Sequence, residues 1–422
     1  MTKLGFTAVA ATGISLALGS AANAEPKTLM LHQWATGSDA ASIAILGEMF
    51  EEAGGSWEQT AISGHTANTL AKLRSDVIGG NAPAAVQLKG PEIAEWNATG
   101  MTSNLDELAA SEGWDEVVAP ELLPVMKPAG SWVAAPMNIH RINWLWASPS
   151  VMEEAGVEKL PETWAELNAA CDKVVAIGKI CLSHSSADWT DSTLFEVVVY
   201  GMDLDLYRSA FVEGDPDAIR SDGMIAALEQ FQKMTSEYMD PGIFGRDWDN
   251  MPVQVGNGDA AFYIMGDWTI GNFAASGFEQ GSDYICAQAP TDWDGAGFIL
   301  NSDSVVFFQQ NDPDYQEGQK LLASTILSPE FQTVFNKSKG SIPARLDVDL
   351  SSGFNPCQEL AQAELKGSIE EGTLVRSMAH NMTVPQAVRG AIMDNVTEFV
   401  ATPEMAPEEA ANRIADAVEA EM

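Results

Sequence analysis

The stretch TLMLHQW, Thr28–Trp34, begins the pattern that decides the fold. It has the composition of a strand, and a helical segment follows it over Ala40–Glu52. A second strand, WEQTAIS (57–63), is followed by Leu70, Leu73 and Val77 at helical spacing. Alternating strands and helices predict an open, mostly parallel sheet flanked by helices, which is the α/β class.

The alternation continues along the chain. AAVQL (84–88) predicts a third strand, and Pro91 starts another helix. Ligands of such sheets bind outside the carboxyl ends of the strands, where Trp34 and Lys89 fall. Further on, SVVFFQQ, Ser304–Gln310, predicts a late strand that returns to the first domain, and the tail from Gln358 is mostly helical. We therefore expect two α/β lobes joined by more than one crossing.

The middle of the chain shows the same alternation. Pro161-Glu162-Thr163 is a helix start signal, and Trp164, Leu167 and Val174 mark the apolar face of the helix that it begins. KICLSHS (179–185) and AAFYIM (260–265) predict strands on either side of a long helix around Met224–Met239.

The N-terminus has the pattern of a secretory signal peptide. Lys3 is followed by an apolar stretch from Leu4 to about Leu18 and by Ala22-Asn23-Ala24. The apolar run is shorter than the ~20 residues of a spanning helix, so we expect cleavage after Ala24 and export to the periplasm. The alternative is an uncleaved membrane anchor.

Composition limits the class of protein. The chain has 422 residues, and 46% of them are hydrophobic, so its length predicts two domains. The formal net charge is −38. A surface this acidic repels nucleic acid and anionic lipid, and we expect neither as a partner.

The four cysteines are Cys171, Cys181, Cys286 and Cys357. An exported protein meets an oxidising compartment, which favours two disulfides. A Cys171–Cys181 bridge would close a short loop, and a Cys286–Cys357 bridge would close a long one. Four buried free thiols are the alternative.

Enzyme and cofactor motifs are absent from the sequence. The five histidines and the cysteines lack metal-ligand spacing, so we expect no metal. Gly256-Asn257-Gly258 opens a partial G-x-G-x-x-A match, but it follows a helix-like segment and indicates a turn, so we expect no cofactor. The 60 acidic residues could still include a glycosidase carboxylate pair, which is defined only in space.

Twelve tryptophans give the most specific indication of function. Sugars stack their C–H faces on aromatic rings, and their hydroxyl groups form hydrogen bonds with charged side chains. A sugar site therefore needs Trp beside Asp, Glu, Lys or His. Asp267-Trp268, Trp34 with Asp39, and Trp248 between two aspartates fit this description. Packing between helix and sheet is the alternative for any single tryptophan.

Several longer motifs carry a family resemblance that covers essentially the whole chain after residue 24. The sequence resembles periplasmic sugar-binding proteins of bacterial ABC importers, in the extracellular solute-binding protein family 1, and is most similar to the glucose/mannose-binding branch. The motifs are LHQWATGSD (31–39), VQLKGPEIAEW (86–96), MNIHRINWLWASPSVMEEAG (137–156), PETWAEL (161–167), AAFYIMGDW (260–268), NSDSVVFF (301–308) and FNKSKGSIPARLDV (335–348).

The resemblance implies a type II periplasmic binding protein fold with a ligand cleft between two lobes. The N-terminal lobe would comprise residues 25–137 and 303–345, and the C-terminal lobe residues 138–302 and 346–422. The resemblance also implies the Cys286–Cys357 disulfide.

Site residues follow from the resemblance where the motifs match. Trp34 corresponds to the aromatic residue after the first strand, although Gln33 stands where many relatives have a second aromatic ring. Asp39 stands at a carboxylate position, Lys89 lies in KGP, and Asp303 corresponds to a hydroxyl-accepting carboxylate. The substrate-binding residues that the resemblance implies are Trp34, Asp39, Lys89, Trp248, Trp268, Asp303, Lys339 and His380, and the pairing with Trp268 adds Asp267.

These observations predict a monomeric receptor that binds a small sugar and delivers it to a membrane permease driven by a separate ATPase. Glucose, mannose or another small pyranoside fits. One alternative is a secreted carbohydrate-active enzyme with an acidic pair. Another is a receptor for a polyamine, which would need an all-acidic cleft, and Lys89, Lys339 and His380 argue against it.

Overall fold

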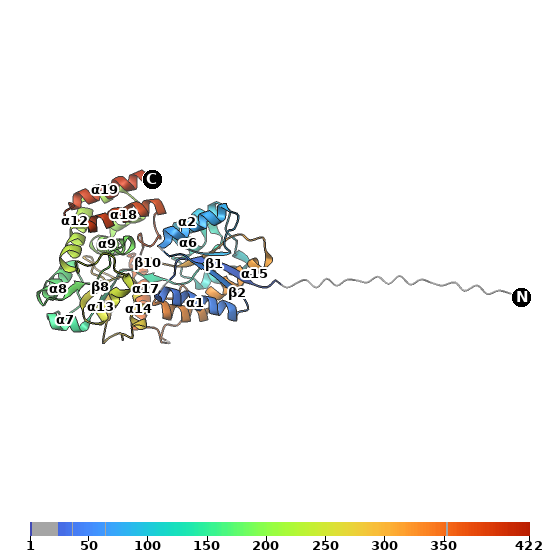
Figure 1. Ribbon diagram of the computed structural model, residues 1–422, viewed down its shortest axis with the longest axis horizontal. Coiled ribbons are helices and arrows are strands. Elements are labelled where there is room, and N and C mark those ends of the chain that lie inside the picture. The colour runs from blue at the N-terminus through green and yellow to red at the C-terminus, as the bar shows by residue number, and fades with distance from the viewer. Residues whose placement is uncertain (2–23, 36, 64, 352) are drawn as a thin grey trace.

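The computed structural model describes residue 1 and residues 24–422, except residues 36, 64 and 352. The predicted signal peptide, residues 1–24, thus lies almost wholly outside the described residues. Two groups of strands and helices lie side by side, with β10 (Ile299–Asn301) between them (Figure 1). This is the two-lobed α/β architecture that the sequence predicts.

The first group is built on a five-stranded sheet. The order of its described strands is β2-β1-β3-β11-β4. Their bounds are Lys27–His32 (β1), Ser56–Ala61 (β2), Ala85–Leu88 (β3), Ala134–Pro136 (β4) and Ser304–Phe307 (β11). β1 is parallel to β2 and β3, and only β11 runs antiparallel to its neighbours β3 and β4. The late strand that the sequence predicts therefore does return to the first sheet.

Helices flank this sheet. α15 contacts β1 and β4, α1 contacts β2, and α16 packs on α1. The helices of this part of the chain are Gly37–Glu52 (α1), His65–Ile78 (α2), Gly90–Ala98 (α3), Asp106–Glu112 (α4), Trp114–Val117 (α5), Leu123–Met126 (α6), the 3₁₀ turn Pro128–Gly130 (η1), Pro313–Ile326 (α15) and Pro329–Lys339 (α16).

The second group contains a four-stranded sheet in the order β7-β8-β6-β9 among the described strands. Their bounds are Trp144–Ala147 (β6), Ile180–Leu182 (β7), Ala260–Ile264 (β8) and Ile285–Gln288 (β9). β7 and β8 are parallel, and β6 runs antiparallel to β8 and β9. β6 is fully buried, which agrees with its apolar sequence WLWA. In both sheets the reversed strand follows directly after the chain has crossed from the other group.

The helices of the second group pack on this sheet and on one another. Predicted helix starts are found where expected, since α8 begins after Thr163, whose Oγ1 accepts the Glu166 N–H at 3.2 Å. The helices are Pro149–Ala155 (α7), Trp164–Ala176 (α8), Asp188–Met202 (α9), Leu204–Tyr207 (α10), Pro216–Ile219 (α11), Asp222–Lys233 (α12), Met251–Gly256 (α13), Thr269–Ala275 (α14), Pro356–Glu371 (α17), Gln386–Ala401 (α18) and Pro407–Glu421 (α19). Shorter turns are the π-helical Arg208–Val212 (η2) and Met234–Tyr238 (η3), and the 3₁₀ turn Trp248–Asn250 (η4).

Short strands connect the two larger sheets. β5 (His140–Arg141) lies antiparallel to β10, and β12 (Val375–Arg376) lies parallel to it. Ile139 and Ile342 exchange backbone hydrogen bonds of 2.8 and 3.0 Å beside them. The chain passes from the first sheet to the second through β5 and returns through β10, so the two groups are joined by more than one crossing.

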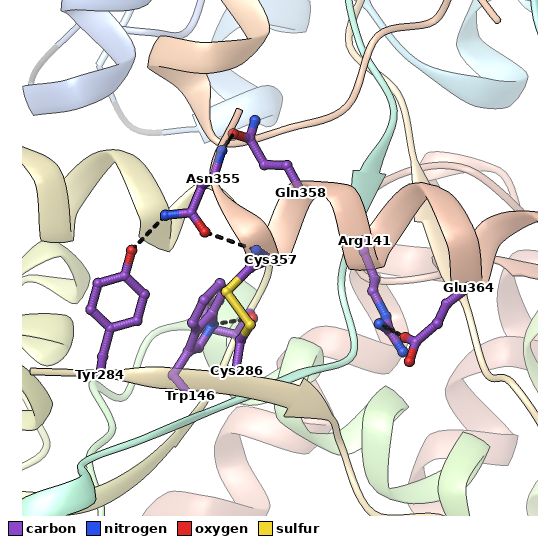
Figure 2. Close-up of a disulfide and its surroundings, with 9 residues drawn as sticks. Arg141, Trp146, Tyr284, Cys286, Asn355, Cys357, Gln358 and Glu364 are labelled. Atoms are coloured by element: carbon purple, nitrogen blue, oxygen red, sulfur yellow. Dashed lines mark hydrogen bonds and ion pairs between the residues drawn. A yellow bond between two sulfur atoms is a disulfide. The ribbon is translucent and has the colours of Figure 1, made fainter. Parts of the chain in front are cut away.

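Both expected disulfides are present. Cys171 of α8 is bonded to Cys181 of β7, and Cys286 of β9 is bonded to Cys357 at the start of α17. Figure 2 shows the second bond beside the hydrogen bond from Asn355 Nδ2 to the Tyr284 hydroxyl oxygen. Together these contacts attach α17 to the edge of the second sheet.

Candidate functional site

A cavity lies where the first sheet, the crossing strands and the second group of helices meet. Its volume is about 130 Å³, on a measure by which one water molecule needs ~10–15 Å³. It can therefore hold a small organic molecule. The residues that line it are Gln33, Trp34, Asp39, Thr66, Lys89, His140, Trp189, Trp248, Trp268, Asn301, Asp303, Lys339, Ala379, His380 and Arg389.

All the site residues expected from the sequence, except Asp267, line this cavity. They come from segments more than 300 residues apart, since Trp34 follows β1 and His380 follows β12. Asp267 is buried behind the wall and is bonded to His140. Their role as sugar contacts remains a prediction.

Four charged side chains line one part of the cavity, which we call the charged wall: Asp39, Lys89, Asp303 and Lys339. Each of them lies at or near the end of a strand or helix. Lys89 follows the carboxyl end of β3, and Asp303 precedes β11. Their side chains form an ion pair with a distance of 2.7 Å between Lys89 Nζ and Asp303 Oδ1. Lys339, the last residue of α16, forms an ion pair with Asp39 in the first turn of α1.

Asp303 is held by four donors. Besides Lys89, Gln87 Nε2 donates to Oδ1 at 3.3 Å, and Asn138 Nδ2 donates to Oδ2 at 3.0 Å. His140 Nε2 also lies 3.0 Å from Oδ2. Burial alone would raise the pKa of this carboxyl, but Lys89, His140 and Lys339 hold the pKa well below its usual range. Asp303 is therefore ionised at neutral pH.

His140 lies between two carboxylates. Its Nδ1 is bonded to Asp267, whose other oxygen accepts the Arg141 backbone N–H at 2.8 Å. Burial alone would lower the pKa of His140, but Asp267 and Asp303 raise it above its usual value. The ring thus links Asp267 to the charged wall.

Aromatic rings that contact one another form a second part of the lining, which we call the aromatic wall: Trp189, Trp248, Trp268 and His380. Trp189 meets Trp248 edge to face with ring centres 5.6 Å apart, and Trp268 lies 5.1 Å from the His380 ring. Gly266 lets Trp268 fold back, because a Cβ there would lie 2.3 Å from the indole ring. Trp34 closes the cavity from the first group, with Lys339 Nζ 5.2 Å from its ring centre.

Three buried polar atoms among the lining residues have no hydrogen-bond partner within the described part of the chain. They are Nε1 of Trp268, Nε2 of His380 and Oδ1 of Asn301. A buried polar atom without a partner is costly. The hydrogen bonding of this region is thus incomplete without a further molecule, whereas Lys89, Lys339, Asp39 and Asp303 are all ion-paired.

Several lining residues were missed by the sequence reasoning. Trp189 repeats the Asp-Trp pattern of Asp267-Trp268, which is a signal that could have found it. His140 stands in one of the motifs quoted above, and Asn301 precedes Asp303 by two residues. Nothing in the sequence separates Thr66, Ala379 or Arg389 from ordinary helix and loop residues.

Two further kinds of feature are missing from the described residues. The described residues contain no group of three His, Cys, Asp or Glu side chains that could hold a metal ion. Among the described helices, none combines the length and the hydropathy needed to cross a bilayer.

Comparisons with known proteins agree with this architecture. Residues 46–364 match the family described as bacterial extracellular solute-binding protein. The chain is 36% identical to a "probable sugar-binding periplasmic protein" of Brucella suis, over 100% of this chain and 99% of that protein. It is 38% identical to a protein of the same description from Rhizobium meliloti, over 98% of both chains.

Solved structures show the same fold at low sequence identity. A chitin oligosaccharide binding protein superposes with a TM-score of 0.81 at 14% identity, covering 93% of this chain and 98% of that one. Maltose-bound MalE3 of T. maritima superposes with a TM-score of 0.74 at 17% identity, covering 94% and 100%. The chain belongs to the bacterial extracellular solute-binding proteins, and it is a binding protein rather than an enzyme.

Proposed function

We propose that this protein is the periplasmic receptor of an ABC-type importer and that its ligand is a small sugar of the glucose or mannose kind. Membership of the solute-binding family supports the receptor role. The relatives described as probable sugar-binding periplasmic proteins, which match the chain over nearly its whole length, support the ligand class and the compartment.

One observation carries the proposal: indole rings and charged side chains line the same small cavity. Trp34, Trp248 and Trp268 offer flat apolar surfaces to the C–H face of a pyranose. Lys89, Asp303 and Lys339 offer charged groups to its hydroxyls, and such hydrogen bonds are worth ~1.5–3 kcal/mol each. The cavity volume supports a mono- or disaccharide rather than a long chain.

The same geometry favours binding over glycoside hydrolysis. A glycosidase needs one carboxylic acid that is protonated near neutral pH and a second carboxylate at a set distance. Asp39 and Asp303, the aspartates that line the cavity, are each paired with a lysine, and the pKa of Asp303 is depressed. The charges in this cavity therefore hold a ligand rather than transfer a proton.

The proposal includes the mechanics of capture. Lobes of residues 25–137 with 303–345 and 138–302 with 346–422 would close on the sugar about the crossing strands. A signal peptide cleaved after Ala24 would place the receptor in the periplasm. There the receptor, as a monomer, would present the loaded cleft to a permease.

A ligand panel tests the proposal. Isothermal titration and thermal unfolding of residues 25–422 with glucose, mannose, galactose and xylose should identify at least one that binds. A ligand that binds only the folded state raises stability by RT ln(1 + [L]/Kd). Small-angle scattering should then show a smaller radius of gyration with that sugar. The proposal fails if a broad sugar panel leaves the melting temperature unchanged while a non-sugar solute raises it.

A further inference from the structure

Glu196, in the middle of α9, is fully buried outside the cavity wall. Its carboxylate accepts the Ser377 hydroxyl at 2.6 Å and the Tyr207 hydroxyl at 2.9 Å. It also accepts the backbone N–H groups of Met378 and Ala379 at 2.8 and 3.2 Å. A carboxylate oxygen accepts hydrogen bonds, so the Ser377 hydroxyl donates to Glu196 Oε1.

That direction reaches His380 through Ser377. The single hydroxyl proton of Ser377 is given to Glu196, so Ser377 Oγ can only accept from its other neighbours. Those neighbours are the His380 backbone N–H at 3.1 Å and His380 Nδ1 at 2.9 Å. Nδ1 must therefore carry a proton.

The other ring nitrogen of His380 is then a bare acceptor. Burial lowers the pKa of His380 below its usual value, and nearby Glu196 opposes this only in part, so the ring is neutral at neutral pH. In a neutral imidazole with a proton on Nδ1, Nε2 presents a lone pair. Nε2 is buried and has no partner within the described residues, and the ring lines the cavity between Trp268 and Trp189.

We propose that Glu196 is a positioning residue for ligand specificity. Through Ser377 it fixes the tautomer of His380, so that Nε2 can only accept a hydrogen bond and the ligand must donate one. This deepens the proposed function and rests on it. The sugar must then place a free hydroxyl at this point. A sugar with a methoxy group, a fluorine or no substituent there leaves the acceptor unpaired.

The expected selectivity follows from the cost of an unpaired buried group. Replacing the one matching hydroxyl by fluorine should weaken binding by roughly 10- to 100-fold. Fluorine at the other ring positions should follow a different pattern, because the charged wall supplies donors such as Lys89 and Lys339 as well as acceptors.

Nitrogen NMR of the histidine ring tests the tautomer directly and without any sugar. In the unmodified protein at pH 7.5, His380 should show a protonated Nδ1 and an unprotonated Nε2. Glu196→Gln places an amide NH₂ group beside Ser377, which frees the Ser377 proton for His380 Nδ1. The tautomer should then shift toward protonated Nε2. Tyr207→Phe is the matched control, because it removes another donor of Glu196 but leaves the Ser377–His380 bond in place.

The second readout is a panel of deoxyfluoro analogues of whichever sugar binds. At one ring position, the unmodified protein and Tyr207→Phe should bind the hydroxyl form much more tightly than the fluorinated form. The ratio of these two affinities should fall at least tenfold in Glu196→Gln. A protonated Nε2 in the unmodified protein, or an equal response to fluorine at every position, overturns the inference even where Glu196→Gln does not fold. If no sugar binds, the proposed function fails, whereas the NMR result still decides the tautomer.

Discussion

The charged wall and the aromatic wall of the cavity differ in how many of their hydrogen bonds are already made within the protein. In the charged wall, Asp303 meets four donors and Lys339 meets Asp39, so its hydrogen bonds are made before any ligand arrives. In the aromatic wall, Trp268 and His380 retain buried polar atoms that have no partner among the described residues. The difference leads us to propose that the charged wall is preorganised and that a ligand completes the hydrogen bonds of the aromatic wall.

The largest effect on stability and affinity is expected from a substitution in the charged wall. Asp303→Asn keeps the shape of the side chain but removes the negative charge that Lys89 and His140 contact. Loss of one partner of a buried ion pair costs about 3–5 kcal/mol, so both the free energy of unfolding and the affinity should fall. Urea unfolding and titration calorimetry measure the two. An unchanged unfolding midpoint would show that Asp303 does not organise this wall.

Trp268→Ala removes one indole ring from the aromatic wall. Loss of its stacking face should cost about 2–4 kcal/mol of binding, or ~30- to 1000-fold in Kd. Trp146, which is fully buried in β6 and does not line the cavity, is the matched control. Trp146→Ala should destabilise the fold by ~3–5 kcal/mol and leave the Kd of the folded fraction unchanged. The reverse result would mean that Trp268 is structural and the sugar binds elsewhere.

A pH experiment tests a contact between the segments that carry the two walls. Glu92 of α3 accepts a 2.8 Å bond from Asn381, which follows His380, and burial raises its pKa to about 7 against the opposing effect of Arg389. Glu95 and Lys89 also face it, and they respectively raise and lower the pKa. Because the folded-state pKa is the higher one, protonation of Glu92 stabilises the folded state below about pH 4.5, and this contribution is lost as the pH rises to about 7.

The variant Glu92→Gln should remove that dependence. The difference in unfolding free energy between Glu92→Gln and the unmodified protein should grow in favour of the variant between pH 4.5 and 7, by at most about 3 kcal/mol. Above pH 7 the difference should be constant. Urea unfolding at four pH values measures it, and a flat difference across the range would contradict the raised pKa of Glu92.

The smallest effect is expected at the open edge of the aromatic wall. Trp248 is only partly buried and meets Trp189 edge to face. Trp248→Ala should therefore weaken sugar binding by about 1 kcal/mol, or roughly fivefold, with little change in melting temperature. A loss as large as that of Trp268→Ala would show that the two rings contribute equally to the wall.

Local patterns in the sequence were enough to predict most of the fold. The strand and helix signals of residues 28–91 correspond to β1, α1, β2, α2, β3 and α3, because burial on a sheet and on a helix leaves different spacings. The late strand at Ser304 was also predictable, since an apolar run bounded by polar residues needs a sheet to bury it. One difference is α12, which begins at Asp222 and continues as a π-helical turn to Tyr238.

The site was predictable only in part. Asp267 was expected in the cavity, but its carboxylate turns to His140, a residue 127 positions away in the sequence. No local pattern encodes a pairing over that separation. Trp189 was missed although Asp188-Trp189 repeats the Asp-Trp pattern of Asp267-Trp268. Its helix is mostly buried, and only the tertiary structure brings the first turn of that helix to the cavity.

The order of the disulfides has a consequence for biogenesis. Along the chain each cysteine is bonded to its neighbour, Cys171 to Cys181 and Cys286 to Cys357. If the chain is exported unfolded from its N-terminus, as we propose, the first pair emerges from the translocon before the second. The nearest unpaired thiol is then always the correct partner. Oxidation in order of emergence yields the native pairs, and the receptor needs a thiol oxidase but no disulfide isomerase.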